Sequence, residues 1–400
     1  MNSKRLLSLI CTIIISLSAI TVNAENSWRA DSVEISLLTC EPHDEVYSLY
    51  GHTAIRVTDK SRNMDIAVNF GLFDQSASMF ALRFVFGLTD YRMGIINISS
   101  FIEEYSYYGS GVRQQRINMT PAEKEHFLSL LAETAKPENV VYRYNFLYNN
   151  CTTRARDLIL GAVNGTVNYK SKGLQVGERS FRDLVHEKVS THRWSAVGND
   201  LLLGVMADCN TSFGEREFLP QVLMTDFDNA NIKRTDGTTT PLVSNAEWLL
   251  PSTHPTVICS EPGFPLTPTQ CAWLFLAIVI VVKMILYLKK ETVLPWFDYG
   301  VACLYATVGL VLLCMVFSEH PTVRLNLQIL VFNPLLFFLA FPRKSNGIIK
   351  KYNIASIVAI LCIVIFFIGN LFQDYAEGMN IMALTLLLTF SEIRIHTSRR

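Results

Sequence analysis

The last third of the chain, residues 266–400, contains long apolar stretches. A helix needs about 20 apolar residues to cross the ~30 Å hydrocarbon core of a bilayer. Three stretches are long enough, and two shorter ones can span only if they are re-entrant, tilted or extended by their flanks. The five stretches are about Cys271–Leu288, Phe297–Phe317, Leu327–Phe341, Ile354–Phe372 and Met379–Phe390. We therefore expect an all-α membrane domain of about five transmembrane helices.

The positive charges around these stretches predict the orientation of the membrane domain. Loops rich in lysine and arginine stay on the cytoplasmic side. The loops SEHPTVRLN and QDYAEG carry a single arginine between them, whereas basic residues follow the first, third and fifth stretches. These basic residues are Lys289, Lys290, Arg343, Lys344, Lys350, Lys351, Arg394, Arg399 and Arg400. An odd number of spans then predicts a multi-pass protein of the inner (cytoplasmic) membrane, with a cytoplasmic C-terminus and an exported region before Pro262.

The first 24 residues have the layout of a secretory signal peptide. Lys4 and Arg5 form a basic start, Leu6–Val22 is an apolar core, and Val22-Asn23-Ala24 is a small-x-small cleavage site. An uncleaved anchor helix is the alternative, and it would export the next segment equally. We expect a signal peptide over 1–24, a periplasmic domain over 25–265 and the membrane domain over 266–400. The formal net charge of +0 gives no indication of a nucleic-acid partner.

The exported region shows the patterns of both strands and helices. Five short runs are β-branched or alternate in polarity, which predicts strands: VEISLLTC, GHTAIRV, IAVNFGLF, VRQQRINM and VVYRYNF. Thr120-Pro121-Ala122-Glu123 is a capping box with proline at the first helical position, and it predicts a helix to about Ala135. A second helix is expected to begin at Cys151. The periplasmic domain is therefore expected to be α+β.

The segment YNFLYNNCTTRARDLIL places Cys151 at the start of that second helix. The partial positive charge of a helix N-terminus stabilises a thiolate, so this position suits a nucleophile. A disulfide is the competing interpretation, because the same exported domain also holds Cys40, Cys209 and Cys259. Four cysteines allow three pairing schemes, and Cys209 with Cys259 is the pair that we favour.

His52, in YSLYGHTAIRV, is the candidate base for this thiol. Imidazole titrates near neutral pH and can return the proton to a leaving group. Asn69, in AVNFG on the next predicted strand, could accept the other ring N–H and fix the tautomer. Each residue also has an ordinary interpretation, as a structural histidine or a turn asparagine. A zinc site of Cys40, His43, His52 and Cys151 is weaker, since no compact ligand pair is matched by a second one, and we expect no metal.

Three neighbours of the thiol are candidates for supporting roles. Asn149 and Asn150 can either cap the helix or donate hydrogen bonds to an oxyanion. Arg154 shares a helix face with Cys151, so it could lower the thiol pKa or hold a phosphate or carboxylate. An exposed salt bridge is equally compatible with the position of Arg154.

The order of these residues and four longer segments carry a family resemblance. His52 and Asn69 precede Cys151, which resembles the circularly permuted papain-like enzymes of the NlpC type and the lecithin:retinol-acyltransferase type. Over essentially the whole chain, the sequence resembles the Lnb family of Bacteroidota. The segments are TCEPHDEVYSLYGHTAIRV, YNFLYNNCTTRARDL, EREFLP at Glu215–Pro220 and HPTVRLNLQILVFNPL. In CEPH, at Cys40–His43, a histidine stands where we expect a glycine after proline.

The resemblance implies a lipoprotein N-acyltransferase with Cys151 as nucleophile, His52 as base and no cofactor. A fatty acyl chain would move from a membrane phospholipid, through a thioester on Cys151, to the α-amine of the lipidated N-terminal cysteine of a diacylated lipoprotein. The apolar run Ser78–Gly87 could then be a lid over acyl chains or an ordinary buried element. His320 and Asn326, on an outward loop, are candidates for binding a lipid head group or ordinary loop residues.

Two other functions are compatible with these features. A membrane-anchored cysteine peptidase or amidase acting on cell-wall peptides would use the same fold and dyad, although it needs at most one anchor. A non-catalytic envelope scaffold would not need Cys151. Its spans should carry buried charges, whereas Lys283 is the exception in these stretches.

Overall fold

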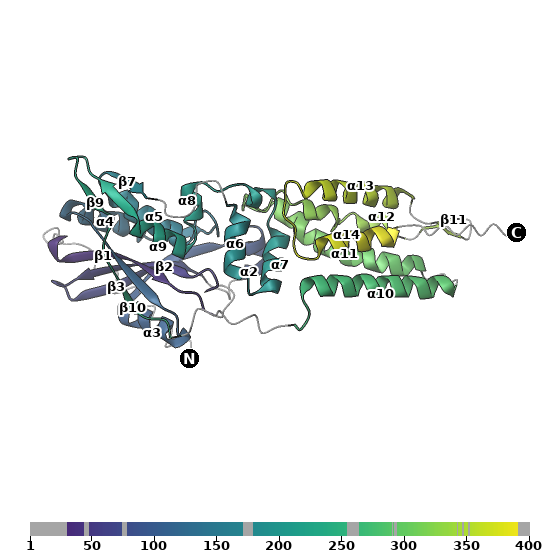
Figure 1. The fold of residues 1–400 in the computed structure, drawn as a ribbon, viewed down its shortest axis with the longest axis horizontal. Coiled ribbons are helices and arrows are strands. Elements are labelled where there is room, and N and C mark those ends of the chain that lie inside the picture. Colours follow the sequence, from purple (N-terminus) through teal and green to yellow (C-terminus); the bar gives the residue numbers. More distant parts are fainter. Residues whose placement is uncertain are drawn as a thin grey trace.

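The computed structural model describes residues 30–43, 48–73, 78–170, 179–253, 264–289, 291, 294–341, 343–345, 348–350 and 353–390. The predicted signal peptide and the basic residues Arg394, Arg399 and Arg400 lie outside these ranges. Along the longest axis, a sheet-rich N-terminal part is followed by a helical C-terminal part (Figure 1). The α+β class of the first part and the helical character of the second are confirmed. The permuted papain-like topology stays a prediction.

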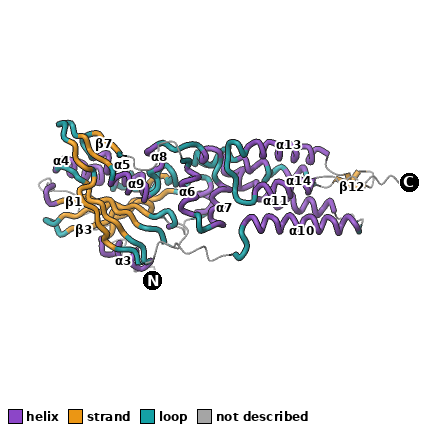
Figure 2. The backbone as a smooth tube through the Cα atoms, in the orientation of Figure 1, coloured by secondary structure: helices purple, strands orange, loops and turns teal. Residues whose placement is uncertain are grey.

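The N-terminal part is built on a seven-stranded sheet in the order β10-β5-β1-β2-β3-β4-β6. Figure 2 shows the strands gathered in this part of the molecule. Every pairing in this sheet is antiparallel. The five predicted runs form strands here, whereas β4 and β10 have no counterpart in the sequence patterns. The strands are β1 (Val33–Cys40), β2 (His52–Asp59), β3 (Met64–Leu72), β4 (Asp90–Asn97), β5 (Val112–Ile117), β6 (Val141–Arg143) and β10 (Val243–Leu250).

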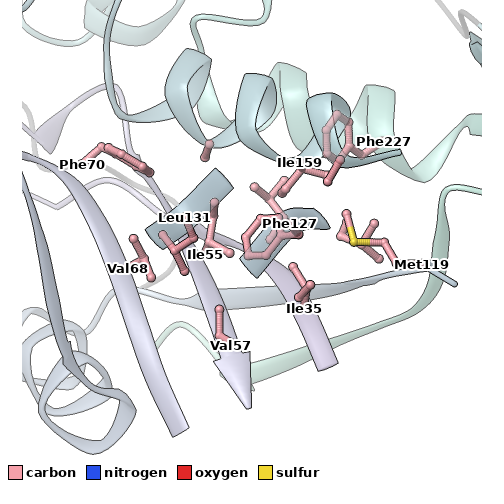
Figure 3. Close-up of a cluster of buried hydrophobic side chains, with 14 of the residues drawn as sticks. Ile35, Ile55, Val57, Val68, Phe70, Met119, Phe127, Leu131, Ile159 and Phe227 are labelled. Carbon is pink, nitrogen blue, oxygen red and sulfur yellow. The ribbon is translucent and has the colours of Figure 1, made fainter. Parts of the chain in front are cut away.

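Helices cover both faces of this sheet. One face carries α4 (Pro121–Thr134), α5 (Cys151–Ala162) and α9 (Pro220–Asp228), and α3 (Ile98–Tyr108) lies on the other. The predicted capping box of Thr120 and Glu123 opens α4, which confirms that helix. Between the sheet and the first three helices lies a buried apolar cluster that includes Ile35, Val57, Phe127, Ile159 and Phe227 (Figure 3).

Short elements complete the N-terminal part. A three-stranded sheet in the order β7-β8-β9 consists of β7 (Thr166–Tyr169), β8 (Ala230–Lys233) and β9 (Thr239–Pro241). The other short helices of the described residues are η1 (Ala30–Ser32), α2 (Phe80–Val85) and α8 (Phe213–Arg216). Toward the membrane helices, the chain forms α6 (Phe181–Val189), α7 (Arg193–Leu202) and η3 (Val205–Asp208), which together we call the bridge.

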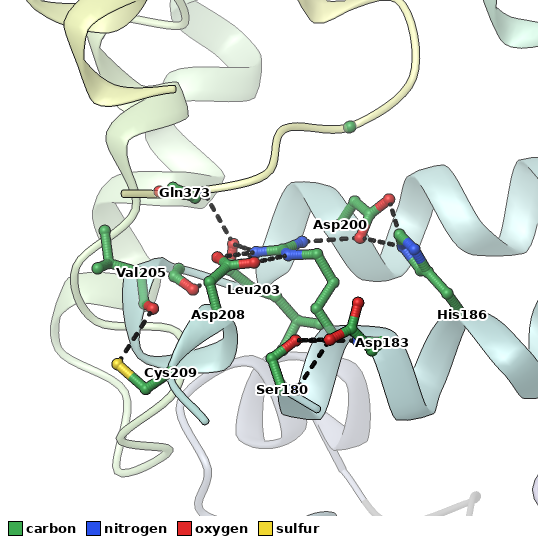
Figure 4. A network of polar contacts seen from close by, with 12 residues as sticks. Ser180, Asp183, His186, Asp200, Leu203, Val205, Asp208, Cys209 and Gln373 are labelled. Atoms are coloured by element: carbon green, nitrogen blue, oxygen red, sulfur yellow. Dashed lines mark hydrogen bonds and ion pairs between the residues drawn. The ribbon is translucent and has the colours of Figure 1, made fainter. Parts of the chain in front are cut away.

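The bridge is held together by a network of polar contacts that includes His186, Asp200 and Asp208 (Figure 4). Arg182, on α6, is 1 % exposed and forms ion pairs of 2.7 Å with Asp200 and with Asp208. His186 also binds Asp200, at 2.8 Å. A buried charge of this kind is tolerated only when its partners satisfy it, and here two carboxylates and two backbone carbonyls do so.

Backbone hydrogen bonds join the bridge to loops of the membrane domain. The amide of Gly204 donates to the carbonyl of Thr322, and the amide of Val205 donates to that of Leu325, each at 2.8 Å. A side chain on Gly204 would overlap the Leu325 carbonyl, so only glycine permits this close approach. Gln373 donates to the carbonyl of Leu203 at 3.1 Å. The bridge therefore lies against the loops that carry few basic residues.

The membrane domain contains fewer long helices than predicted. Among the described residues, α10 (Pro268–Leu288) and α11 (Leu294–Val316) are long and apolar enough to cross a bilayer, whereas α13 (Asn353–Gly369) and α14 (Met379–Phe390) are shorter. The strands β11 (Arg343–Ser345) and β12 (Ile348–Lys350) pair in the basic loop, so the domain is not all-α.

The third apolar stretch, one of the two that are short for a simple span, is not a continuous helix. The stretch forms only η4 (Leu327–Leu330) and α12 (Leu336–Leu339). Pro334 lies between them, and a proline both lacks an N–H and disfavours a helical conformation of the residue before it. Asn333 caps the turn that follows, since its side chain accepts from the amide of Leu335 at 3.0 Å.

Lys283, the exceptional charge in the apolar stretches, has a partner. Its ammonium lies 3.0 Å from a carboxylate oxygen of Asp298 on α11 and donates to the carbonyls of Leu388 and Thr389 on α14. Asp298 is fully buried. The pair therefore links three helices, and it gives the lysine the partners that a charge inside a bilayer requires.

Candidate active site

Cys151 is the first residue of α5, as the sequence predicts, and Asn150 is the N-cap. The side-chain oxygen of Asn150 accepts from the amides of Thr152 and Thr153, each at 2.9 Å. Its side-chain nitrogen donates to the carbonyls of Phe146 and Phe218. Both ends of this amide are engaged, so Asn150 caps the helix, and the alternative of an oxyanion donor is corrected.

Asn149 and Arg154 form a second fixed group beside the thiol. The Asn149 side chain donates to the carbonyl of Arg143 at 2.7 Å and accepts from Nε of Arg154 at 2.9 Å. The guanidinium of Arg154 lies 3.7 Å from the ring centroid of Tyr142. Among the described residues no ion pair of Arg154 is seen, so a stacked and hydrogen-bonded arrangement takes the place of the alternative salt bridge.

The three residues that we predict to be catalytic lie together. His52 begins β2, and Asn69 lies on β3, where the register pairs it with Ala54. Nε2 of His52 is 3.0 Å from Oδ1 of Asn69. An amide oxygen only accepts, so Nε2 carries a proton, and Nδ1 is the nitrogen left for the Cys151 thiol. The imidazole and the thiol are close enough for each to shift the pKa of the other.

The backbone conformation of Gly51 positions His52 at the start of β2. Its φ of 77° is in the left-handed region, which side chains other than glycine rarely adopt. A Cβ on this residue would also lie 2.8 Å from the carbonyl oxygen of Cys40. The glycine in GHTAIRV therefore allows a tight turn directly before the strand that holds the imidazole.

The electrostatics of the pair favour a thiolate. Burial by itself raises the pKa of the Cys151 thiol, but the charge of His52, its hydrogen bond and the backbone N–H of Thr53 lower that pKa to about 7. Burial also works against protonation of His52, yet the neighbouring Cys151 and Asn69 raise the pKa of His52 overall. The two shifts have the same cause, which is the attraction between thiolate and imidazolium.

This pairing predicts how the thiol reacts at different pH values. The alkylation rate of Cys151 by iodoacetamide should rise with pH through an inflection near 7, below the ~8.5 of an ordinary cysteine. In His52→Ala the inflection should move upward, because burial is then no longer opposed by the imidazolium. Peptide mapping without prior reduction measures the rate and separates Cys151 from the exposed Cys209. An unchanged inflection in His52→Ala, or a disulfide at Cys151, would contradict the pair.

The other exported cysteines have different surroundings. Cys40 is a fully buried thiol opposite His52 in the sheet, and its burial raises its pKa well above the usual range. Cys209 is a free, exposed thiol whose sulfur is 3.8 Å from the carbonyl of Val205. Cys259 lies outside the described residues, so the predicted pairing with Cys209 stays untested. Within the described residues, no three His, Cys, Asp or Glu side chains could hold a metal ion.

Two threonines next to the dyad were not singled out by the sequence patterns. Thr53 follows His52, Thr152 follows Cys151, and their hydroxyl oxygens are 3.1 Å apart in a fully buried contact. The Thr152 hydroxyl is 3.8 Å from the sulfur of Cys151. This bond ties the start of α5 to the start of β2. The signal available in the sequence is the repeated pattern of a reactive residue followed by threonine.

An apolar cavity lies between the site and the membrane domain. Its volume is about 280 Å³, and its lining includes Phe84, Tyr91, Tyr144 and His320. The predicted head-group residue His320 is thus part of a cavity wall, and burial lowers its pKa. Asn326 is not available to a head group, and that expectation is corrected. It is 4 % exposed, donates to the carbonyl of Leu201, and accepts from Gln328 and Gln373.

The run Ser78–Gly87 is not an ordinary buried element. It contains α2, around which Met79, Leu82 and Phe84 are 65 %, 44 % and 39 % exposed. The carbonyl of Phe86 accepts from the amide of Glu319 at 3.0 Å, just beyond the end of α11. This apolar turn therefore lies at the junction with the membrane domain, and the lid interpretation stays a prediction.

Comparisons with known proteins agree with this two-part arrangement. Residues 21–187 match the model of the Lnb N-terminal periplasmic domain, and residues 260–400 match that of the Lnb transmembrane domain. Cys151, His52 and Asn69 all fall within the first match. No curated protein and no solved structure matches the chain.

Proposed function

Since this chain belongs to the Lnb family, a family with a periplasmic and a membrane domain, we propose that it is a lipoprotein N-acyltransferase. It transfers a fatty acyl chain from a membrane phospholipid to the α-amine of the lipidated N-terminal cysteine of a diacylated lipoprotein. The observation that carries this proposal is the position of the Cys151–His52 pair, which lies next to an apolar cavity shared with the membrane domain. Both substrates are lipids of the bilayer, and a cavity of this kind brings them to the thiol.

In the first half-reaction the thiolate of Cys151 attacks the ester carbonyl of the phospholipid. A carbon–sulfur bond forms, the carbon–oxygen ester bond breaks, and the imidazolium of His52 gives its proton to the departing lysophospholipid. The backbone N–H of Cys151 is not used by the Asn150 cap, which binds Thr152 and Thr153. That amide, at the positive end of α5, can therefore stabilise the oxyanion.

In the second half-reaction the neutral α-amine of the lipoprotein attacks the thioester. A carbon–nitrogen bond forms, the carbon–sulfur bond breaks, and His52 accepts the proton that the amine loses. Asn69 holds the imidazole in one orientation through both steps, since its oxygen binds Nε2 at 3.0 Å. The products are a triacylated lipoprotein and a regenerated thiolate–imidazolium pair.

The proposal is tested with the purified full chain in detergent micelles. The reaction contains a diacyl phospholipid and a synthetic diacylated lipopeptide with a free α-amine, and mass spectrometry detects one added acyl chain. The matched control is the same lipopeptide with an acetylated α-amine, which should gain none. Cleavage of the peptide part, or release of fatty acid alone, would point to a hydrolase and overturn the proposal.

We further propose that the C-terminus is cytoplasmic. The basic loop with β11 and β12 lies at the opposite end of the membrane domain from the bridge (Figure 1). This separation supports the orientation that the positive charges predict. A periplasm-dependent phosphatase fused after Arg400 should be inactive, and a cytoplasm-dependent fluorescent protein there should be active. The same two reporters fused after Thr253 should behave oppositely, and the reverse of either pattern would contradict the orientation.

A further inference from the structure

We propose that the cavity between the sheet and the membrane domain binds the fatty acyl chain while that chain is attached to Cys151, and that α2 forms its wall toward the bilayer. This inference rests on the proposed function and adds to it the site of the acyl chain. The cavity combines residues from three parts of the chain, so it exists only when the two domains are joined. The N-terminal part contributes Phe84 and Tyr144, the bridge contributes Val185 and Leu202, and the membrane domain contributes Met315 and Val323.

The size and lining of the cavity suit an alkyl chain. Its volume is about 280 Å³. An apolar cavity of ~150 Å³ in another protein stays dry and binds benzene, so a larger apolar space is a favourable site for methylene groups. Burial lowers the pKa of His320, which keeps this imidazole neutral in the cavity wall. The polar side chains Tyr50 and Asn199 satisfy each other through a hydrogen bond of 2.7 Å.

Two stacked tyrosines connect the thiol to the cavity. A Cβ on Gly71 would lie 3.9 Å from Cβ of Cys151 and 4.0 Å from the ring of Tyr91, so both side chains border the space above this glycine. The ring of Tyr91 stacks on that of Tyr144 with centroids 4.0 Å apart. Both rings also line the cavity. An acyl group on the sulfur can therefore extend along this aromatic wall into the cavity.

The opposite side of the cavity faces the membrane surface. Phe84 lines the cavity and is 39 % exposed, and Met79 and Leu82 expose further apolar area next to it. The hydrogen bond between Phe86 and Glu319 fixes this turn just beyond the end of α11, which is the level of the outer bilayer surface. A phospholipid chain that leaves the bilayer beside α2 thus meets Phe84 first and the tyrosine wall next.

The inference is tested by narrowing the cavity and comparing donors of different chain length. Leu202→Trp places an indole where the chain would lie. In the absence of acceptor, acylation of Cys151 by dipalmitoyl phosphatidylcholine should slow on the order of tenfold or more, whereas acylation by the dihexanoyl lipid should be little changed. Val323→Phe narrows the cavity from the membrane side and should act in the same way. The matched control is Leu130→Trp on α4, a half-buried leucine that does not line the cavity.

A second measurement separates this inference from the proposed function. A phosphatidylcholine with a photoreactive diazirine near the end of its palmitoyl chain is added to the unmodified full chain. Cross-links should map to peptides containing Phe84, Leu202 or Val323, and dipalmitoyl lipid should compete more strongly than dihexanoyl lipid. Equal slowing with both donors, or cross-links confined to α10 and α14, which do not line the cavity, would overturn the cavity inference. A chain that cross-links as expected but never forms acyl-Cys151 would instead overturn the proposed function.

Discussion

Cys151→Ser is expected to fold like the unmodified protein and to lose acyl transfer by on the order of 10⁴-fold or more. The two side chains differ by one atom, so the packing of α5 and the Asn150 cap should be kept. A serine hydroxyl is far less acidic than a thiol whose pKa is lowered to about 7, and His52 cannot hold it as an anion. An ester intermediate would also resist attack by an amine.

The measurement uses phospholipid with hydroxylamine in place of the lipopeptide, so that it reports the acyl-enzyme directly. The unmodified protein should release acyl hydroxamate, and Cys151→Ser should release none. Cys209→Ser is the matched control, because Cys209 is the exposed thiol of the same domain and should be dispensable. Equal melting temperatures show that the variants are folded. Full transfer by Cys151→Ser would show that another group is the nucleophile.

Local signals explain which parts of the fold can be predicted from the sequence. The capping box at Thr120 and the cap before Cys151 each involve residues within four consecutive positions, so the start of both helices can be predicted from the sequence. Strand β10 has no such signal. Its place beside β5 depends on pairing between residues more than a hundred positions apart, such as Trp248 with Arg113. The break in the third apolar stretch is signalled by Pro334, and the stretch is also short for a span.

The same distinction holds within the site. His52 and Asn69 come together because β2 and β3 are consecutive antiparallel strands, which the sequence patterns predict. The role of Asn150 as a helix cap, with no free N–H for an oxyanion, depends instead on its hydrogen bond to the carbonyl of Phe218, 68 residues away. The side chain of Asn326 is likewise occupied by hydrogen bonds to Leu201 and Gln373, which come from other segments. Composition and spacing cannot specify these contacts, because each joins segments that are far apart in the sequence and meet only in the folded structure.

His52→Ala is expected to reduce acyl transfer by about 10²–10⁴-fold, the usual contribution of a positioned general base. The loss has two physical causes. The thiol loses the charge that lowers its pKa against the effect of burial, and the amine loses the group that accepts its proton. Imidazole added to the solution should restore part of the activity of His52→Ala and none of that of Cys151→Ser. The matched control is His126→Ala, which removes an exposed histidine of α4 and should be neutral.

Asn69→Ala should cost less than His52→Ala, because Asn69 orients the imidazole and exchanges no proton with substrate. Its loss frees Nε2 from the bond of 3.0 Å, so the ring can adopt the other tautomer or turn away from the sulfur. Activity should fall at every pH, and the alkylation inflection of Cys151 should rise by less than it does in His52→Ala. Asn69→Asp keeps an accepting oxygen at the same place and should retain more activity than Asn69→Ala. If Asn69→Ala and Asn69→Asp both match the unmodified protein in rate and inflection, the histidine is held by the sheet alone, and the third member of the triad must be sought elsewhere.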